Sequence, residues 1–128
     1  MDAPGNTTID ERPKSAVPAV RPLDADRDRE AVLGLWRRNL PEGAAERYEW
    51  LYRSGRARGW LGCDTAGNAV GAIGLLSREI RLFGAPCSAG QPIDLNVDRS
   101  HRLGGLAMRL QRSLIDAPCE GRPALIYG

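Results

Sequence analysis

Between residues 93 and 117 the chain changes from one spacing of apolar residues to another. Ile93, Leu95 and Val97 are separated by single polar residues, and this alternation predicts a β-strand with one apolar face. The polar stretch 98–105 follows and ends in two glycines. From Leu103 onwards, apolar residues recur at steps of three and four, which predicts an amphipathic helix containing Leu103, Leu106, Ala107, Leu110, Leu114 and Ala117.

The rest of the chain shows the same two periodicities in shorter pieces. Residues 1–16 show neither, and we expect a disordered leader ahead of one domain over 17–128. Helices are predicted from about Arg27 to Asn39 and near Ala44–Arg56. Strands are predicted at 17–22, 57–63, 69–76, 77–83 (a separate strand or a continuation), 87–97 and 122–127, with turns at 64–68 and 84–86.

Glycines and aromatic residues refine this outline. Gly71 and Gly74 weaken the strand at 69–76, so we expect a bulge or a close backbone approach there. On the second helix, Tyr48, Leu51 and Tyr52 share one face, and Trp50 is expected on the surface. Core packing is the expected role of the buried aromatic rings.

The order of elements predicts the fold class. Strand, two helices, several antiparallel strands, helix and strand together indicate a mixed α/β fold with one strand–helix–strand unit near the end. At 128 residues the chain is long enough for a single small domain with one core.

Charge and cysteine content argue against several classes of function. A net charge of +2, with acids and bases mixed along the chain, gives no electrostatic case for nucleic-acid binding. Cys63, Cys87 and Cys119 are too widely spaced for a disulfide framework or a metal clip, so we expect reduced, mostly buried thiols and no metal. No segment resembles a signal sequence or a membrane span, and we predict a cytoplasmic protein without a membrane partner.

The turn before the last helix has the features of a phosphate site. The first backbone N–H groups of a helix lack intrahelical partners, and the helix dipole favours negative charge. Gly104 and Gly105 would let a diphosphate approach the main chain closely. The segment Arg102-Leu-Gly-Gly105-Leu-Ala107 follows Arg/Gln-x-x-Gly-x-Gly/Ala, and it is neither a Rossmann fingerprint nor a P-loop.

This pattern, placed after an apolar strand, resembles the acetyl-CoA signature of the GNAT superfamily of N-acetyltransferases. The resemblance covers about residues 17–128 and implies a GNAT-like acyl-CoA N-acyltransferase fold. It implies that backbone groups of Leu95, Asn96 and Val97 bind the pantetheine arm and the thioester. It also implies that the pyrophosphate is held by amides of Leu103, Gly104, Gly105, Leu106 and Ala107.

The resemblance also has a limit at the end of the chain. GNAT enzymes continue after the strand matched by 122–127 with a helix and two strands, which form part of the acceptor pocket and often carry a tyrosine that protonates the leaving thiolate. The sequence ends at Tyr127-Gly128, so we expect a truncated GNAT-like domain with an exposed sheet edge. Dimerisation through that edge, strand exchange or poor solubility is the expected consequence.

Asp94 is the best candidate for a catalytic residue. It lies on the strand where the thioester would sit, and a carboxylate there could take a proton from an ammonium through water. A structural aspartate that bonds neighbouring backbone is the alternative interpretation. Glu79 is a weaker candidate base, His101 is expected to be a loop residue, and Arg102 is either a phosphate ligand or a solvated loop residue. The general acid is unassigned.

Two hypotheses about function follow. The first is an N-acetyltransferase that moves acetyl from acetyl-CoA to a primary amine by direct attack, with an unknown acceptor. The second is a truncated or degenerate GNAT-like module that binds CoA or a protein partner without catalysis.

Overall fold

A computed structural model describes residues 18–40, 42, 44–116, 123 and 125–128 of the chain. The predicted leader, Ala117, Cys119 and part of the predicted last strand lie outside the described residues. No helix among the described residues is long and apolar enough to cross a membrane.

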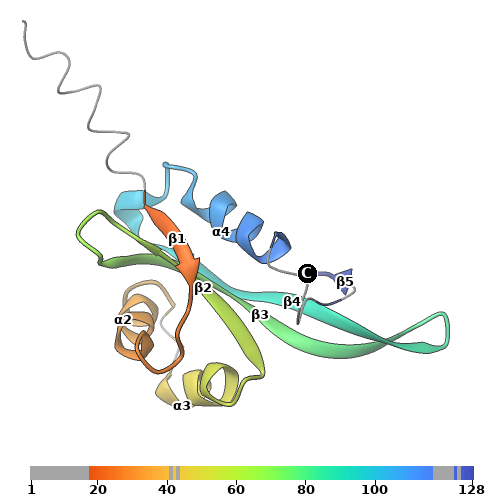
Figure 1. The fold of residues 1–128 in the computed structure, drawn as a ribbon. Coiled ribbons are helices and arrows are strands. Elements are labelled where there is room, and N and C mark those ends of the chain that lie inside the picture. The colour runs from red at the N-terminus through yellow and green to blue at the C-terminus, as the bar shows by residue number, and fades with distance from the viewer. Residues whose placement is uncertain (1–17, 41, 43, 117–122, 124) are drawn as a thin grey trace, which may run out of the picture.

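The core of the fold is a five-stranded sheet with neighbours in the order β1-β2-β3-β4-β5 (Figure 1). Adjacent strands from β1 to β4 are antiparallel to one another, and β5 runs parallel to β4. The strands are β1 Ala19–Pro22, β2 Ala57–Cys63, β3 Ala69–Leu82, β4 Ala85–Val97 and β5 Leu125–Ile126. The predicted mixed α/β fold is therefore confirmed.

Helices pack on both faces of the sheet (Figure 1). One face carries α2 (Arg29–Asn39) and α3 (Ala45–Tyr48), which continues as the π-helix Glu49–Arg53, and the other carries α4 (Leu106–Ile115). The second predicted helix is thus shorter than 44–56 and changes its hydrogen bonding midway, because Ser54 N–H bonds Glu49 C=O five residues back.

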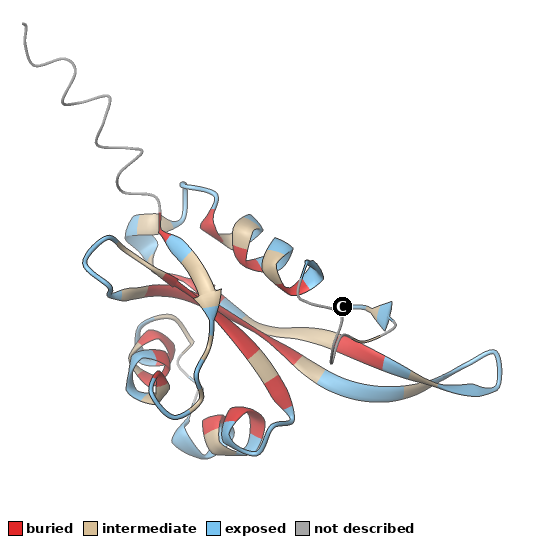
Figure 2. Cartoon of the chain, viewed as in Figure 1, coloured by how far each residue is buried: buried red, intermediate tan, exposed pale blue. Residues whose placement is uncertain are grey.

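Each face has its own apolar cluster, and buried residues follow the part of the sheet that the helices cover (Figure 2). Under α2 and α3, the rings of Trp36, Tyr48 and Tyr52 lie together, with centroids 5.2 Å apart for the two tyrosines. Trp60 is buried in the cluster under α4. These rings pack in the core as predicted, and Trp50 is exposed as predicted.

The long hairpin of β3 and β4 decides between the two alternatives for the predicted strand 77–83 and corrects one turn prediction. Residues 77–82 continue β3, so the predicted strands at 69–76 and 77–83 are one element. The turn is Phe83-Gly84 rather than 84–86, and both residues have positive φ, 52° and 83°. Such a pair of angles is what a two-residue hairpin turn with the native strand twist requires.

A β-bulge in β4 breaks the alternation predicted for residues 93–97. Ala72 pairs with Asn96 while Gly74 pairs with Ile93, so Asp94 and Leu95 together oppose one residue of β3. Ile93 packs against the cluster under α2 and α3, whereas Val97 belongs to the cluster under α4. The prediction that Ile93 and Val97 share one face is therefore wrong, because the extra residue reverses the side on which the following side chains lie.

Gly74 confirms the close approach predicted on β3. A Cβ built at Gly74 would overlap the Tyr52 hydroxyl oxygen and would lie 3.0 Å from Tyr52 Cζ. Gly71 has the same role under α4, because a Cβ there would lie 2.9 Å from Leu106 Cδ2. The two glycines let a tyrosine and a helix rest directly on the strand.

Candidate functional site

β4 and β5 pair over a short distance. Among the described residues they pair at Ala89 with Leu125 and at Gly90 with Ile126. Beyond this point, a cavity of about 370 Å³ lies beside β4, and we call it the β4–β5 cavity. Its lining includes Ile93, Asp94 and Leu95 of β4, Leu114 and Ile115 of α4, and Ile126 of β5.

Asp94 lies in the wall of this cavity at the bulge. Its φ of 57° is in the left-handed region that non-glycine residues seldom adopt. Asp94 also lines a second cavity of about 310 Å³, the α2–α3 cavity, together with Trp36, Leu40, Glu42 and Arg47. Asp94 therefore borders two cavities, one beside α2 and α3 and the other beside α4.

The two carboxylate oxygens of Asp94 have different surroundings. Oδ1 accepts a hydrogen bond from Arg47 Nη2 at 2.8 Å, and Oδ2 is buried with no hydrogen-bond partner in the described structure. Burial raises the pKa of the Tyr52 hydroxyl, and the negative charge of Asp94 raises it further. Asp94 thus has one buried oxygen without a hydrogen-bond partner, which is uncommon for a buried polar atom.

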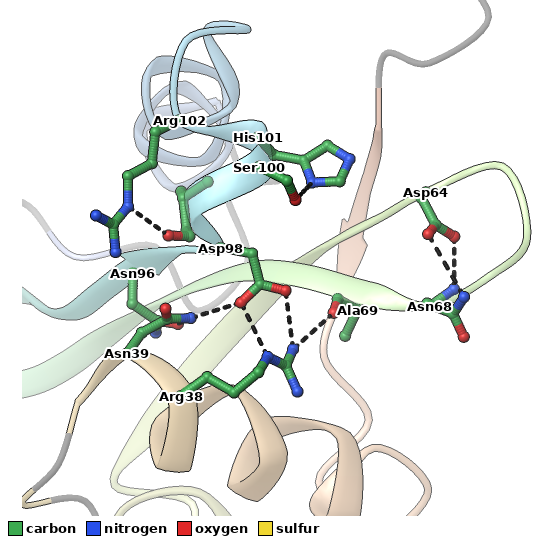
Figure 3. A network of polar contacts seen from close by, with 11 residues as sticks. Arg38, Asn39, Asp64, Asn68, Ala69, Asn96, Asp98, Ser100, His101 and Arg102 are labelled. Atoms are coloured by element: carbon green, nitrogen blue, oxygen red, sulfur yellow. Dashed lines mark hydrogen bonds and ion pairs between the residues drawn. The ribbon is translucent and has the colours of Figure 1, made fainter.

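A chain of polar side chains holds the bulge from the side of α2. Figure 3 shows four of its members, Arg38, Asn39, Asn96 and Asp98. Buried Asn96 donates from Nδ2 to the carbonyl of Asp94 at 2.9 Å and accepts from Asn39 Nδ2 at 3.2 Å. Asn39 also donates to Asp98 Oδ1 at 2.8 Å, and Arg38 holds both carboxylate oxygens of Asp98, at 3.1 and 2.9 Å.

α4 begins without a capping side chain. Its N-cap is Gly105, which has a φ of 81° and makes no side-chain capping hydrogen bond within the described structure. The amides of the first helical turn therefore have no intrahelical acceptor. Leu106 is 0% exposed and packs where Gly62 and Gly71 leave room, which fixes the start of the helix against β2 and β3.

The helix starts three residues later than predicted. Leu103, placed in the apolar face of the helix by its spacing, precedes α4 and is 102% exposed. A 3-10 helix at Arg99–His101 and the turn after it occupy the segment between Asp98 and Gly105. The spacing pattern cannot detect this, because residues in a turn have no fixed face.

The structure brings some of the predicted site residues together and separates others. Asp94 and Leu95 line the β4–β5 cavity, whereas the side chains of Asn96 and Val97 are buried beside it. Arg102 donates from Nε to the Val97 carbonyl at 2.9 Å, which ties the glycine turn to the end of β4.

The two weaker candidates lie away from both cavities. Glu79 pairs with Ser88 on the exposed outer half of the hairpin and lines neither cavity. His101 lies 3.0 Å from the Ser100 hydroxyl in the 3-10 helix. Among the described residues, no group of three or more His, Cys, Asp and Glu side chains could hold a metal ion.

Sequence patterns did not single out Arg47 or Asn39. Arg47 lies in the aromatic-rich segment 46–52, and Asn39 is the last residue of α2. Both act on β4 residues at least 47 positions away in the chain. The only local sign is a polar residue at a helix end, which is too common to indicate a site.

No family model matches the chain, and no curated protein matches it in sequence. Solved structures do match. A ribosomal-protein-alanine N-acetyltransferase from Brucella melitensis is 23% identical with a TM-score of 0.67, and the match covers 85% of this chain and 77% of that one. A GNAT family N-acetyltransferase from Escherichia coli in complex with CoA is 22% identical with a TM-score of 0.67, over 80% of this chain and 56% of that one.

A glucosamine-6-phosphate N-acetyltransferase from Arabidopsis thaliana is similar over 86% of this chain and 80% of its own length, with 16% identity and a TM-score of 0.65. These three structures share their architecture with this chain despite low sequence identity. The chain therefore has the GNAT N-acetyltransferase fold, as the pattern from Arg102 to Ala107 predicted.

Proposed function

We propose that the chain binds acetyl-CoA and transfers its acetyl group to a primary amine by direct attack. The observation that carries the proposal is the position of Asp94, in a wall shared by the β4–β5 cavity and the α2–α3 cavity. A thioester on one side of this wall and an amine on the other could meet at the bulge.

The proposed cofactor site runs along α4. The diphosphate binds the amides from Leu103 to Ala107, where the helix dipole and the two glycines favour an anion. From Gly105 to Leu114 the helix rises about 13 Å, at 1.5 Å per residue. An elongated ligand anchored at the helix N-terminus therefore reaches the β4–β5 cavity, and its arm bonds the backbone of Leu95, Asn96 and Val97 along the way.

The proposed transfer assigns one proton movement to Asp94. The carboxylate accepts a proton from the acceptor ammonium, directly or through water, so that a neutral amine attacks the thioester carbon. A C–N bond forms, the C–S bond breaks, and the sulfur leaves as a thiolate that takes up a proton. Among the described residues lining the β4–β5 cavity there is no tyrosine or cysteine to supply that proton.

The lack of a tyrosine or cysteine among the described residues that line the β4–β5 cavity favours a second candidate function. A GNAT-like module that binds CoA or a protein partner without catalysis needs the helix N-terminus and the cavity but no acid. The two candidates differ in turnover and share cofactor binding where the module binds CoA, so cofactor binding is tested first.

The test is calorimetric titration of acetyl-CoA into the purified 128-residue chain and its Gly105→Glu variant. Saturable binding by the native chain that is lost in the variant supports a diphosphate site at 102–107. Gly84→Glu is the matched control, because Gly84 also has a positive φ, 83°, and open space around its Cα, but lies at the hairpin tip. A folded native chain that gives no heat contradicts the proposed cofactor site.

The acceptor is tested once binding is established. Two of the structural neighbours are described as acting on a ribosomal-protein alanine and on glucosamine 6-phosphate. A peptide with an N-terminal alanine and an amino-sugar phosphate are therefore the first acceptors, with release of free CoA thiol as the readout. Binding of acetyl-CoA without thiol release from any primary amine favours the non-catalytic module.

A further inference from the structure

We infer that Asn39 and Asn96 are positioning residues that fix the peptide plane between Asp94 and Leu95, so that the Leu95 N–H points at the thioester carbonyl of bound acetyl-CoA. This inference rests on the proposed function and extends it to two residues that line neither cavity. Its basis is the direction of the hydrogen bonds that link Asp98, Asn39, Asn96 and the Asp94 carbonyl, and Figure 3 draws the first three of these residues.

The charge of Asp98 sets which groups donate and which accept in this series of hydrogen bonds. Burial raises the pKa of this carboxyl, but the hydrogen bonds from Arg38 and Asn39 outweigh burial and leave the pKa below its ordinary value. Asp98 is therefore ionised at neutral pH and can only accept hydrogen bonds. Arg38 donates to both carboxylate oxygens of Asp98. Since the ionised carboxylate can only accept, the group of Asn39 that faces Asp98 Oδ1 must be the amide nitrogen and not the amide oxygen.

The orientation of the Asn39 amide in turn fixes the orientation of the Asn96 amide. The Asn39 amide nitrogen has two N–H groups and donates one to Asp98 and the other to Asn96 Oδ1. Asn96 must then turn its own Nδ2 towards the Asp94 carbonyl, 2.9 Å away. A reversed Asn96 amide would place two N–H groups against each other and two carbonyl oxygens against each other, so only one orientation is satisfied.

The last step is the geometry of the peptide bond. The described residues contain no cis peptide bond, so the C=O of Asp94 and the N–H of Leu95 point in opposite directions. Asn96 holds the carbonyl on the side of α2. The Leu95 N–H consequently points away from α2, and Leu95 lines the β4–β5 cavity.

A donor fixed in this way is suited to polarising a carbonyl. The bulge leaves Asp94 and Leu95 opposite one residue of β3, which takes this peptide out of the regular ladder. Hydrogen-bond donors held in place before the reaction stabilise charge that develops on oxygen, since they need no reorganisation. The chain from Arg38 to Asn96 provides that fixation without contact with the substrate.

The experiment measures the carbonyl stretch of acetyl-CoA labelled with ¹³C at the thioester carbon, bound to the native chain and to three variants. Asn96→Leu removes the donor to Asp94 and keeps a buried side chain of similar size. Asn39→Ala removes the group that orients Asn96 at a half-buried position, where folding is less sensitive. Gln91→Leu is the control, because this β4 amide accepts from Arg78 at 3.2 Å and does not contact the bulge.

We expect the carbonyl band to move to higher wavenumber in Asn96→Leu and Asn39→Ala and to stay unchanged in Gln91→Leu. The dissociation constant of acetyl-CoA should stay within about threefold of the native value in all three, because the diphosphate site is intact. An unchanged band in Asn39→Ala and in folded Asn96→Leu, with tight binding, would overturn the inference and leave the proposed function standing. Absence of acetyl-CoA binding by the folded native chain would overturn both.

Discussion

Arg47 donates a hydrogen bond from Nη2 to Oδ1 of Asp94 at 2.8 Å, and this contact joins α3 to the bulge of β4. The Asp94 side chain is only 13% exposed, and its other oxygen has no partner in the described structure. A buried carboxylate with one bonded oxygen depends strongly on that bond, because the charge has little water to replace it.

Loss of Arg47 should therefore be costly only while Asp94 is charged. We expect Arg47→Met to lower the free energy of unfolding by about 1–3 kcal/mol. The same change made in an Asp94→Asn background should cost much less, since no charge is left unpaired. Urea unfolding of the four proteins at neutral pH measures the coupling, and strictly additive effects would show that the pair contributes nothing.

Asp94→Asn should remove the proposed proton acceptor without disturbing the cofactor site. Once an amine acceptor is known, we expect turnover to fall by about 10²- to 10⁴-fold, the range typical of general base catalysis. The dissociation constant of acetyl-CoA measured by calorimetry should stay near the native value. Native turnover in the variant would leave Asp94 with a purely structural role.

Gly74→Ala should destabilise the chain because the new methyl group meets Tyr52. We expect a loss of about 1–3 kcal/mol, the usual cost of overpacking. Tyr52→Phe removes the hydroxyl oxygen that lies nearest but leaves Cζ at 3.0 Å, so the double variant should recover only part of the loss. Thermal or urea unfolding of both variants checks this, and a Tyr52→Phe change that worsens Gly74→Ala would contradict the described contact.

Leu106 and Leu103 form a matched pair of leucines on either side of the start of α4. Leu106→Ala should cost about 2–5 kcal/mol, because a fully buried leucine leaves a cavity when truncated. Leu103→Ala should change stability by no more than about 0.5 kcal/mol, since the side chain is exposed. Equal losses in the two variants, measured by urea unfolding, would mean that α4 starts at Leu103 after all.

Asp28 should make stability depend on pH below about 4. The bidentate hydrogen bonds from Arg21, at 2.8 and 2.9 Å, lower the pKa of Asp28 to about 2. Since the folded pKa lies below the usual value of about 3.9, the stabilisation is present above pH 4 and is lost as the pH falls towards 2. It amounts to roughly 1–2 kcal/mol after allowance for the partly exposed Arg21.

The measurement is urea unfolding of the native chain and Asp28→Asn at a series of pH values from neutral to about 2. The difference between them should shrink as the pH falls through the window just described. Asp26→Asn serves as the control, because the Asp26 side chain is 83% exposed in its ion pair with Arg53. A difference that stays constant with pH would show that the charge of Asp28 is not the cause.

The sequence predicted the parts of this fold that depend on local pattern. The segment from Arg102 to Ala107 indicated the GNAT fold, and the alternating residues of β2, β3 and β4 indicated the meander. Gly74 was expected to mark a close approach, and the Tyr52 ring lies on it. In each case, the residues next to each other in the chain carry the physical reason for the structure.

The parts that sequence reasoning missed depend on contacts between distant residues. The bulge at Asp94 is set by pairing with β3 and by the side chain of Asn96, so the alternation of residues 93–97 could not reveal it. Leu103 keeps the spacing of a helical residue but lies in a turn. Arg47 and Asn39 meet β4 only in the folded chain.

The exposed outer half of the β3–β4 hairpin should open locally more easily than the rest of the sheet. From Ser77 onwards β3 has little burial, whereas Ala89 on β4 is 1% exposed, so protection from solvent begins abruptly at that residue. β5 pairs with β4 at this same boundary, at Ala89 and Gly90. Regions with few buried contacts open locally at low free energy, and amide hydrogens there exchange with solvent faster than those of the core. Fraying that travels down the hairpin from its tip would therefore reach the pairing of β4 with β5 at Ala89 and Gly90 before it reaches the bulge at Asp94.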